Sequence, residues 1–240
     1  VAINLYNGWI GIPKNLDIMN ADQTSLGINW NINKKLNLSS NIYYKKINKL
    51  IEYNSRKRFK YESDFVKGNA EAYGIELLLK KQYGKINGIV SYTYSRSRKY
   101  LYNTEYRPKY DIPHNFRARI IYEYSKKWEL GFKFLYKTGQ PFTKRIGNYS
   151  SLYDTGEDMF IGDDNVPLYS EKNSFRLPPY HRLDFHISHD FKYKDRDFQW
   201  YLNLINIYGR LNVLDYSSIN GESWIQLPPL ATIGIRGELW

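Results

Sequence analysis

Strict alternation of apolar and polar residues is the feature that most limits how this chain can fold. In residues 128–137, WELGFKFLYK, the side chains of Trp128, Leu130, Phe132, Phe134 and Tyr136 fall at every second position. Successive side chains of a β-strand point to opposite faces, so this pattern predicts a strand with one large aromatic and aliphatic face. Such a face has to meet either a protein core or a medium other than water.

The same period recurs along the chain and predicts nine strands. No segment has a convincing helical period. The predicted strands cover residues 25–30, 36–44, 73–80, 88–95, 116–124, 128–137, 182–191, 198–204 and 231–239. The chain is therefore predicted to be all-β.

The connections between these strands alternate between short and long. The short ones are residues 31–35, 83–85, 125–127 and 192–197, and the long ones are 53–68, 100–112, 138–179 and 209–227. In an up-and-down meander, all short turns then lie at one end and all long loops at the other. Outer-membrane barrels sort their connections in this way, whereas a Greek-key sandwich has no reason to do so. The predicted fold is an antiparallel up-and-down transmembrane β-barrel.

The two faces of the predicted strands differ in a way that fits this fold. Several aromatic residues lie within a few positions of a short turn, as in an interfacial belt: Trp30, Trp128, Phe191, Phe198 and Trp200. The aromatic face is therefore expected to meet lipid. The residues predicted to line the lumen on the opposite face are Arg117, Arg119, Lys133, Arg182, Asp184 and His186.

Nine strands is an odd number, and bacterial single-chain barrels have an even number. Residues 1–21 have the character of another long loop. The whole chain, residues 1–240, is thus predicted to be the C-terminal part of a larger barrel, without a plug domain or signal peptide of its own. An error of one in the strand count is the alternative.

Several motifs resemble those of TonB-dependent outer-membrane receptors. The first is LDIMNADQTSLGINW, followed by a strand ending in NIYYKKINKLIEY. The others are NAEAYGIELLLKKQYGKINGIVSYTYSRSR, YDIPHNF, FRLPPYHRLDFHISHDF and LNLINIYGRLN, in the family's order. Gly74 and Glu76 match the YG-E pattern of that family. The family's barrels end on an aromatic residue in phase with the lipid-facing row. Trp240 is one residue out of phase, so a bulge near Gly237 is expected.

The resemblance implies a receptor that takes up a scarce nutrient, such as a siderophore, cobalamin, a saccharide or a peptide, and that is neither an enzyme nor a cofactor protein. It implies location in the outer membrane, contact with lipid and lipopolysaccharide, and coupling to TonB through an upstream region. A surface lipoprotein is a further candidate partner. Three loop tyrosines are predicted to contact the nutrient: Tyr149, Tyr153 and Tyr169.

Composition narrows the remaining possibilities. The absence of cysteine excludes disulfides, thiolate metal sites and cysteine nucleophiles. The net charge of +11 suits anionic partners, although a solvated lysine-rich surface explains it equally well. The basic and aromatic stretch 57–68 would suit single-stranded nucleic acid, but on an external loop it is expected to face lipopolysaccharide or a ligand instead.

Two acidic or histidine-rich stretches are candidates for chemistry. HRLDFHISHD places Asp184, His186 and Asp190 on one face, but neighbours two apart on a strand lie about 7 Å from one another. A lumen lining is expected there rather than a metal or acid–base site. GEDMFIGDDN in loop 138–179 lacks the ligand spacing of an EF-hand, so a solvated loop is expected rather than a calcium site.

Two functional alternatives remain open from the sequence. One is a secreted all-β protein that binds or hydrolyses carbohydrate and buries the aromatic row in its core. The other is an outer-membrane barrel enzyme, in which a change at His186 or Asp184 would remove a hydrolytic activity.

Overall fold

The computed structural model describes residues 17–54, 59–150, 152–154, 159–161, 166–216, 222–226 and 228–237; for β10 and β11 the backbone alone is described. These residues form strands and connections without a helix. The nine main strands are β1 (Asn20–Asn33), β2 (Leu36–Tyr53), β3 (Phe65–Lys81), β4 (Ile86–Leu101), β6 (His114–Glu123), β7 (Trp128–Lys137), β14 (Tyr180–Tyr193), β15 (Arg196–Ile205) and β18 (Leu230–Gly237). All nine predicted strands are confirmed.

The smaller strands belong to the long connections. They are β5 (Thr104–Tyr106), β8 (Pro141–Phe142), β9 (Arg145–Tyr149), β10 (Leu152–Asp154), β11 (Met159–Ile161), β12 (Val166–Tyr169), β13 (Phe175–Arg176), β16 (Val213–Tyr216) and β17 (Ser223–Ile225). β5 pairs with β4, and the others pair among themselves as short two-stranded ribbons. Loop 138–179, which the sequence indicated only as a loop, thus contains paired segments of its own.

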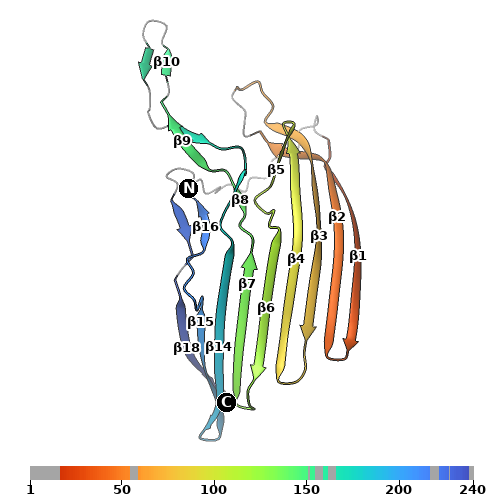
Figure 1. Ribbon diagram of the computed structural model, residues 1–240, viewed down its shortest axis with the longest axis vertical. Coiled ribbons are helices and arrows are strands. Elements are labelled where there is room, and N and C mark those ends of the chain that lie inside the picture. Colours follow the sequence, from red (N-terminus) through yellow and green to blue (C-terminus); the bar gives the residue numbers. More distant parts are fainter. Residues whose placement is uncertain are drawn as a thin grey trace.

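The nine main strands form one antiparallel sheet in the order β1-β2-β3-β4-β6-β7-β14-β15-β18. Each strand pairs with the next main strand along the chain, so the predicted meander is confirmed. The four short turns lie together at one end of the sheet, and the ribbons of the long connections lie at the other, where β9 and β10 rise well beyond the main strands (Figure 1).

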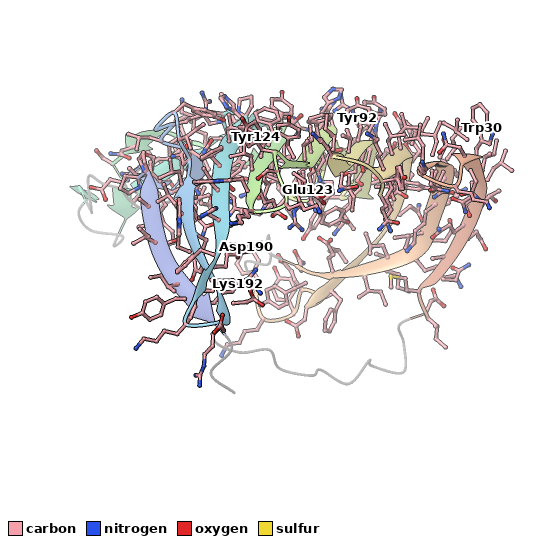
Figure 2. All side chains as sticks on the ribbon, turned by 90° about the horizontal axis from the view of Figure 1, so that it is seen from below. Trp30, Tyr92, Glu123, Tyr124, Asp190 and Lys192 are labelled. Atoms are coloured by element: carbon pink, nitrogen blue, oxygen red, sulfur yellow. The ribbon has the colours of Figure 1, made fainter. Side chains whose placement is uncertain are left out.

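The sheet is curved like part of a barrel wall, and its two faces carry different side chains. Figure 2 shows Trp30, Tyr92 and Tyr124 on the convex side, and Glu123, Asp190 and Lys192 on the concave side. Residues that are opposite one another in register share a face. The aromatic row of β7 therefore lies on the convex face, since Tyr136 is in register with Phe116, which is in register with Tyr92.

Strands β2, β3 and β4 are much longer than predicted. They contain 18, 17 and 16 residues, whereas a tilted strand needs about 9–11 to cross a bilayer. The extra length lies toward the long-loop end. There, β2 and β3 shift register between Ile47 and Leu50, and Lys49 adopts a positive φ of 54°. Because the bulge breaks the two-residue period, alternation alone does not predict the continuation of β2.

Among the described residues, fully buried apolar side chains are confined to the long-loop end of the sheet. The buried apolar side chains are Leu50, Ala70, Leu101, Phe142 and Leu177. Leu50 and Leu101 flank Gly68 in register, and a Cβ at Gly68 would lie 2.4 Å from a methyl carbon of Leu101. Glycine at this position lets the leucine cover the backbone.

The predicted bulge before the final residue is not tested. β15 and β18 pair without a register shift from Ile205 and Leu230 to Phe198 and Gly237. Trp240 lies outside the described residues. Within those residues, no helix is long and apolar enough to span a membrane.

Candidate functional site

A hollow of about 570 Å³, lined by both polar and apolar residues, lies on the concave face, where β6, β7, β14, β15 and β18 adjoin. The polar side chains that line it are Arg119, Glu129, Lys133, Asp184, His186, Asn203 and Thr232. Four of the six predicted lumen residues are thus brought together. The other two, Arg117 and Arg182, lie one row toward the long loops, in register on either side of Leu135.

Asp184 is held by groups on both sides of its carboxylate. Arg182 Nε lies 2.9 Å from Oδ1 of Asp184, and Arg182 Nη2 donates a hydrogen bond to Oδ2 at 3.0 Å. The backbone N–H of Asn206 donates to Oδ1 at 3.0 Å. Because the side chain of Asn206 is itself buried, this carboxylate anchors the turn that follows β15.

His186 is part of a hydrogen-bonded row that crosses three strands. Its Nδ1 lies 2.7 Å from Oδ1 of Asn203, and Asn203 Nδ2 donates to Oγ1 of Thr232 at 3.2 Å. Since the amide oxygen only accepts, the proton of a neutral His186 is on Nδ1 and Nε2 is left as an acceptor. Gly131 provides the space, because a Cβ there would lie 3.1 Å from the Cβ of His186.

The cations of the hollow have fewer nearby groups of opposite charge than Asp184 has. Arg119 and Lys133 are neighbours in register, and both are exposed. In the described part of the chain, neither forms an ion pair within 4 Å, while Arg117 donates to the side chain of Asn115 at 3.3 Å. The concave wall therefore presents positive charge to whatever occupies its hollow.

The acidic and histidine cluster of β14 does not converge on one point. Asp184 is paired with Arg182, His186 with Asn203, and Asp190 accepts a hydrogen bond of 2.6 Å from Gln199. His189 of the same stretch lies on the opposite, convex face, where its ring stacks on Trp128 at a centroid distance of 4.3 Å. Among the described residues, no three His, Asp or Glu side chains gather in a way that could hold a metal ion.

The predicted aromatic belt takes a specific form at the short-turn end. Trp128 and Trp200 pack edge to face at 5.5 Å, and Phe191 and Phe198 stack at 5.7 Å. The ring centroid of His189 lies 6.3 Å from that of Trp200, so His189 joins this group, in agreement with the alternation that puts it on the same face as Phe191.

The three predicted nutrient-contacting tyrosines lie in two short ribbons of loop 138–179, the β9–β12 pair and the β10–β11 pair. Tyr149 and Tyr169 are exposed and occupy opposite ends of the β9–β12 pair, because Tyr149 faces Val166 and Tyr169 faces Arg145 in register. The backbone of Tyr153 lies in β10, and its side chain is outside the described residues. The acidic stretch considered for calcium lies largely outside them as well.

A polar cluster that sequence reasoning missed ties loop 138–179 to the sheet. Glu52 at the end of β2 forms an ion pair with Lys99 of β4, accepts a hydrogen bond of 2.8 Å from the hydroxyl of Tyr106, and lies 3.8 Å from Nζ of Lys172. Lys172 also lies over the Tyr106 ring at 4.3 Å. We call these four residues the Glu52 latch.

The latch lies beyond the membrane-spanning part of β2, since Glu52 is far more than about 11 residues from the short turn. Burial alone would raise the pKa of Glu52, but the hydrogen bonds from Lys99 and Tyr106 outweigh it and the pKa is lowered. Burial and the bond to charged Glu52 raise the pKa of Tyr106 far above its usual range.

We predict that the Glu52 latch weakens in acid. A carboxyl group with a lowered folded-state pKa stabilises the fold above its ordinary pKa near 4, and this contribution is lost as pH falls through the lowered value. Protease cleavage within loop 138–179 of the full-length protein is therefore expected to accelerate below about pH 4. Glu52→Gln is expected to give faster cleavage at neutral pH and to flatten this dependence; an unchanged profile would contradict the assignment.

A second missed cluster is centred on Asp111, whose side chain is fully buried. Its carboxylate pairs with Arg176, lies 3.8 Å from Nη1 of Arg96, and accepts a 2.8 Å hydrogen bond from the backbone N–H of Ser97. Arg176 Nη1 also donates to the carbonyl oxygens of Asp111 at 2.7 Å and Gly139 at 3.0 Å. These bonds join β4, the segment before β6 and the return of loop 138–179. Asp111 and Arg176 belong to the motifs YDIPHNF and FRLPPYHRLDFHISHDF. These two motifs were the sequence signal that could have pointed to the cluster.

A curved meander with an apolar convex face, a polar concave face and connections sorted by length defines the class as a membrane β-barrel wall. Residues 2–207 match the model of the TonB dependent receptor-like, beta-barrel family. The chain belongs to this family, whose members are proteins of the outer membrane. No curated protein sequence matches it.

Solved structures of receptors share the fold. The ferric-catecholate import receptor Fiu of E. coli K12, in its closed form, aligns with a TM-score of 0.63 at 14% identity, over 93% of this chain and 28% of Fiu. The ferripyoverdine receptor of Pseudomonas aeruginosa aligns with a TM-score of 0.65 at 11% identity, over 92% and 27%. The iron transporter FrpB of Neisseria meningitidis gives 0.61 at 15% identity, over 95% and 32%. The chain thus spans less than a third of each of these proteins.

Proposed function

We propose that this chain is the barrel wall and part of the ligand-binding mouth of a TonB-dependent receptor that imports a scarce nutrient. The observation that carries the proposal is the separation of the two ends. The long connections lie at one end of a wall whose inner face is polar and positively charged. Long extracellular loops of outer-membrane barrels are suited to capturing ligand, and a polar inner face to its passage.

In the proposed receptor, a plug encoded upstream closes the barrel, and TonB delivers the energy that opens it. The exposed cations Arg117, Arg119 and Lys133 are proposed to face the plug or the ligand path, together with His186, whose Nε2 is free to accept. Lipopolysaccharide surrounds the outer rim, and a surface lipoprotein is a further proposed partner.

Ferric complexes are the first nutrient class to test. The aligned structures are those of a ferric-catecholate import receptor, a ferripyoverdine receptor and an iron transporter. At 11–15% identity this likeness supports the choice of test and does not set the substrate. Cobalamin, saccharides and peptides belong in the same panel.

The enzyme alternative is less well supported. Its candidate residues Asp184 and His186 each serve a structural neighbour, Arg182 and Asn203 respectively, and do not contact one another. The secreted alternative required the aromatic row to be buried in a core. In the described residues this row occupies the convex face, with 42% of Phe132 exposed.

The proposal is tested by deleting the full-length gene in its own cell and measuring uptake of each nutrient class, with and without TonB. Loss of uptake of one class, restored by the gene only when TonB is present, is the expected result. Uptake that is unchanged for every class, or that persists without TonB, would contradict the proposal.

The loop tyrosines give a finer prediction. Tyr149→Ala combined with Tyr169→Ala is expected to raise the half-saturating nutrient concentration by roughly 10-fold, because aromatic anchors contribute strongly to recognition. Tyr193→Ala is the matched control, since Tyr193 is similarly exposed but lies at the short-turn end. Equal effects of the two changes would place the ligand contacts elsewhere.

A further inference from the structure

The two ends of the sheet differ sharply in charge. The four long connections, residues 54–64, 102–113, 138–179 and 206–229, together contain eleven Lys or Arg and twelve Asp or Glu. The four short turns with two flanking residues on each side, residues 32–37, 80–87, 122–129 and 192–197, contain ten Lys or Arg and only four Asp or Glu. The positive net charge of the chain is therefore concentrated at the short-turn end.

These cations lie at the surface of the short-turn end of the sheet. All but one are exposed, the exception being half-buried Lys80: the full set is Lys34, Lys35, Lys80, Lys81, Lys85, Lys126, Lys127, Lys192, Lys194 and Arg196. Lys192 pairs with Asp197 at 3.7 Å, and both side chains of this pair are well exposed to solvent. Within the described residues, no acid lies within ion-pair distance of Lys85, Lys126 or Lys127.

Aromatic side chains share this level of the sheet. Lys35 Nζ lies 3.2 Å from the centroid of the Tyr83 ring, and Lys194 Nζ lies 5.5 Å from that of Tyr193. Tyr83 and Tyr193 are 57% and 59% exposed. Just inside them on the convex face is the packed group around Trp128 and Trp200. Indole and phenol rings beside solvated amines are the composition of a surface that meets lipid headgroups.

We propose that the basic rim, defined as the cations above other than Lys80 and Lys192, binds the headgroups of anionic phospholipids in the periplasmic leaflet of the outer membrane. Lys80 and Lys192 lie on the concave side, away from lipid. Short turns of outer-membrane barrels are periplasmic, which puts the rim at that leaflet. The charge is spread over all four turns, and none of these cations lines the hollow of the concave face described above. A fluid layer of anionic lipid headgroups therefore matches this charge distribution better than one compact ligand does. The inference is independent of which nutrient, if any, the receptor imports.

The test uses the full-length receptor in bilayers of phosphatidylcholine with about 20 mol% phosphatidylglycerol, and counts the lipids retained on the protein by native mass spectrometry. The retained ratio of phosphatidylglycerol to phosphatidylcholine is expected to exceed the bulk ratio roughly 3-fold at about 50 mM salt. It should fall toward the bulk ratio at about 500 mM, because the screening length shortens.

Two triple variants locate the site. The rim variant carries Lys85→Gln, Lys126→Gln and Lys127→Gln, and the control carries Lys60→Gln, Lys109→Gln and Lys144→Gln at the long-loop end. The rim variant is expected to lose at least about half of the enrichment and the control to retain it. No enrichment in the wild type, or an equal loss in both variants, would overturn the proposal, while nutrient uptake measured in parallel reports on the proposed function separately.

Discussion

Leu77→Arg is expected to deplete the full-length protein from the outer membrane, whereas Leu78→Arg leaves its level close to normal. The two residues are adjacent in β3 and almost equally exposed, at 37% and 38%. Leu77 is in register with Tyr92 on the convex face, and Leu78 with Ser91 on the concave face. Four residues of strand, about 13 Å, separate Leu77 from the short-turn end of β3, which places it near the middle of the apolar band.

An arginine at the bilayer midplane costs about 2–4 kcal/mol of insertion free energy on the lipid face of a barrel strand. On the inner face, water and the neighbouring polar side chains solvate it at little cost. The measurement is the amount of folded protein in the outer-membrane fraction, separated from unfolded protein by its gel mobility without heating. If Leu78→Arg were the more damaging of the pair, the convex face would not be the one that meets lipid.

Asp111→Asn is expected to release the long-loop end from the sheet. Removing this carboxylate leaves Arg176 and Arg96 without their buried partner, and breaking a buried ion pair in this way costs about 3–5 kcal/mol. The loops from 102 to 113 and from 138 to 179 should then open far more often. Their rate of cleavage by a dilute protease is expected to rise on the order of a hundred-fold, while the strands stay protected.

The matched control is Glu105→Gln, which removes an acid from the same long connection. Glu105 pairs with Arg98 at 3.3 Å, but both side chains are well exposed, so the pair contributes less than about 1 kcal/mol. A cleavage rate that rises equally in both variants would mean that burial does not strengthen the Asp111 pair. Arg176→Lys is informative as well, because lysine cannot reach both carbonyl oxygens and the carboxylate at once.

Most of the sheet was predictable from the chain alone. The alternation in WELGFKFLYK predicted both β7 and its two faces, and the lengths of the connections predicted that all short turns lie at one end. The candidate wall residues were found for the same reason: Arg119, Lys133, Asp184 and His186 sit at inward positions of neighbouring strands, where the pleat brings them together.

The sequence by itself determined the strands, their antiparallel order and the face that each side chain takes, because these follow from a two-residue period and from turns between neighbours in the chain. Only the tertiary structure decided how the long-loop end closes. Glu52 and Lys99 are 47 positions apart, and Asp111 and Arg176 are 65 apart. Such pairs depend on how far β2 to β4 extend and on where loop 138–179 folds back. Nothing local encodes this, because the bulge at Lys49 interrupts the alternation and the loop's charges carry no period.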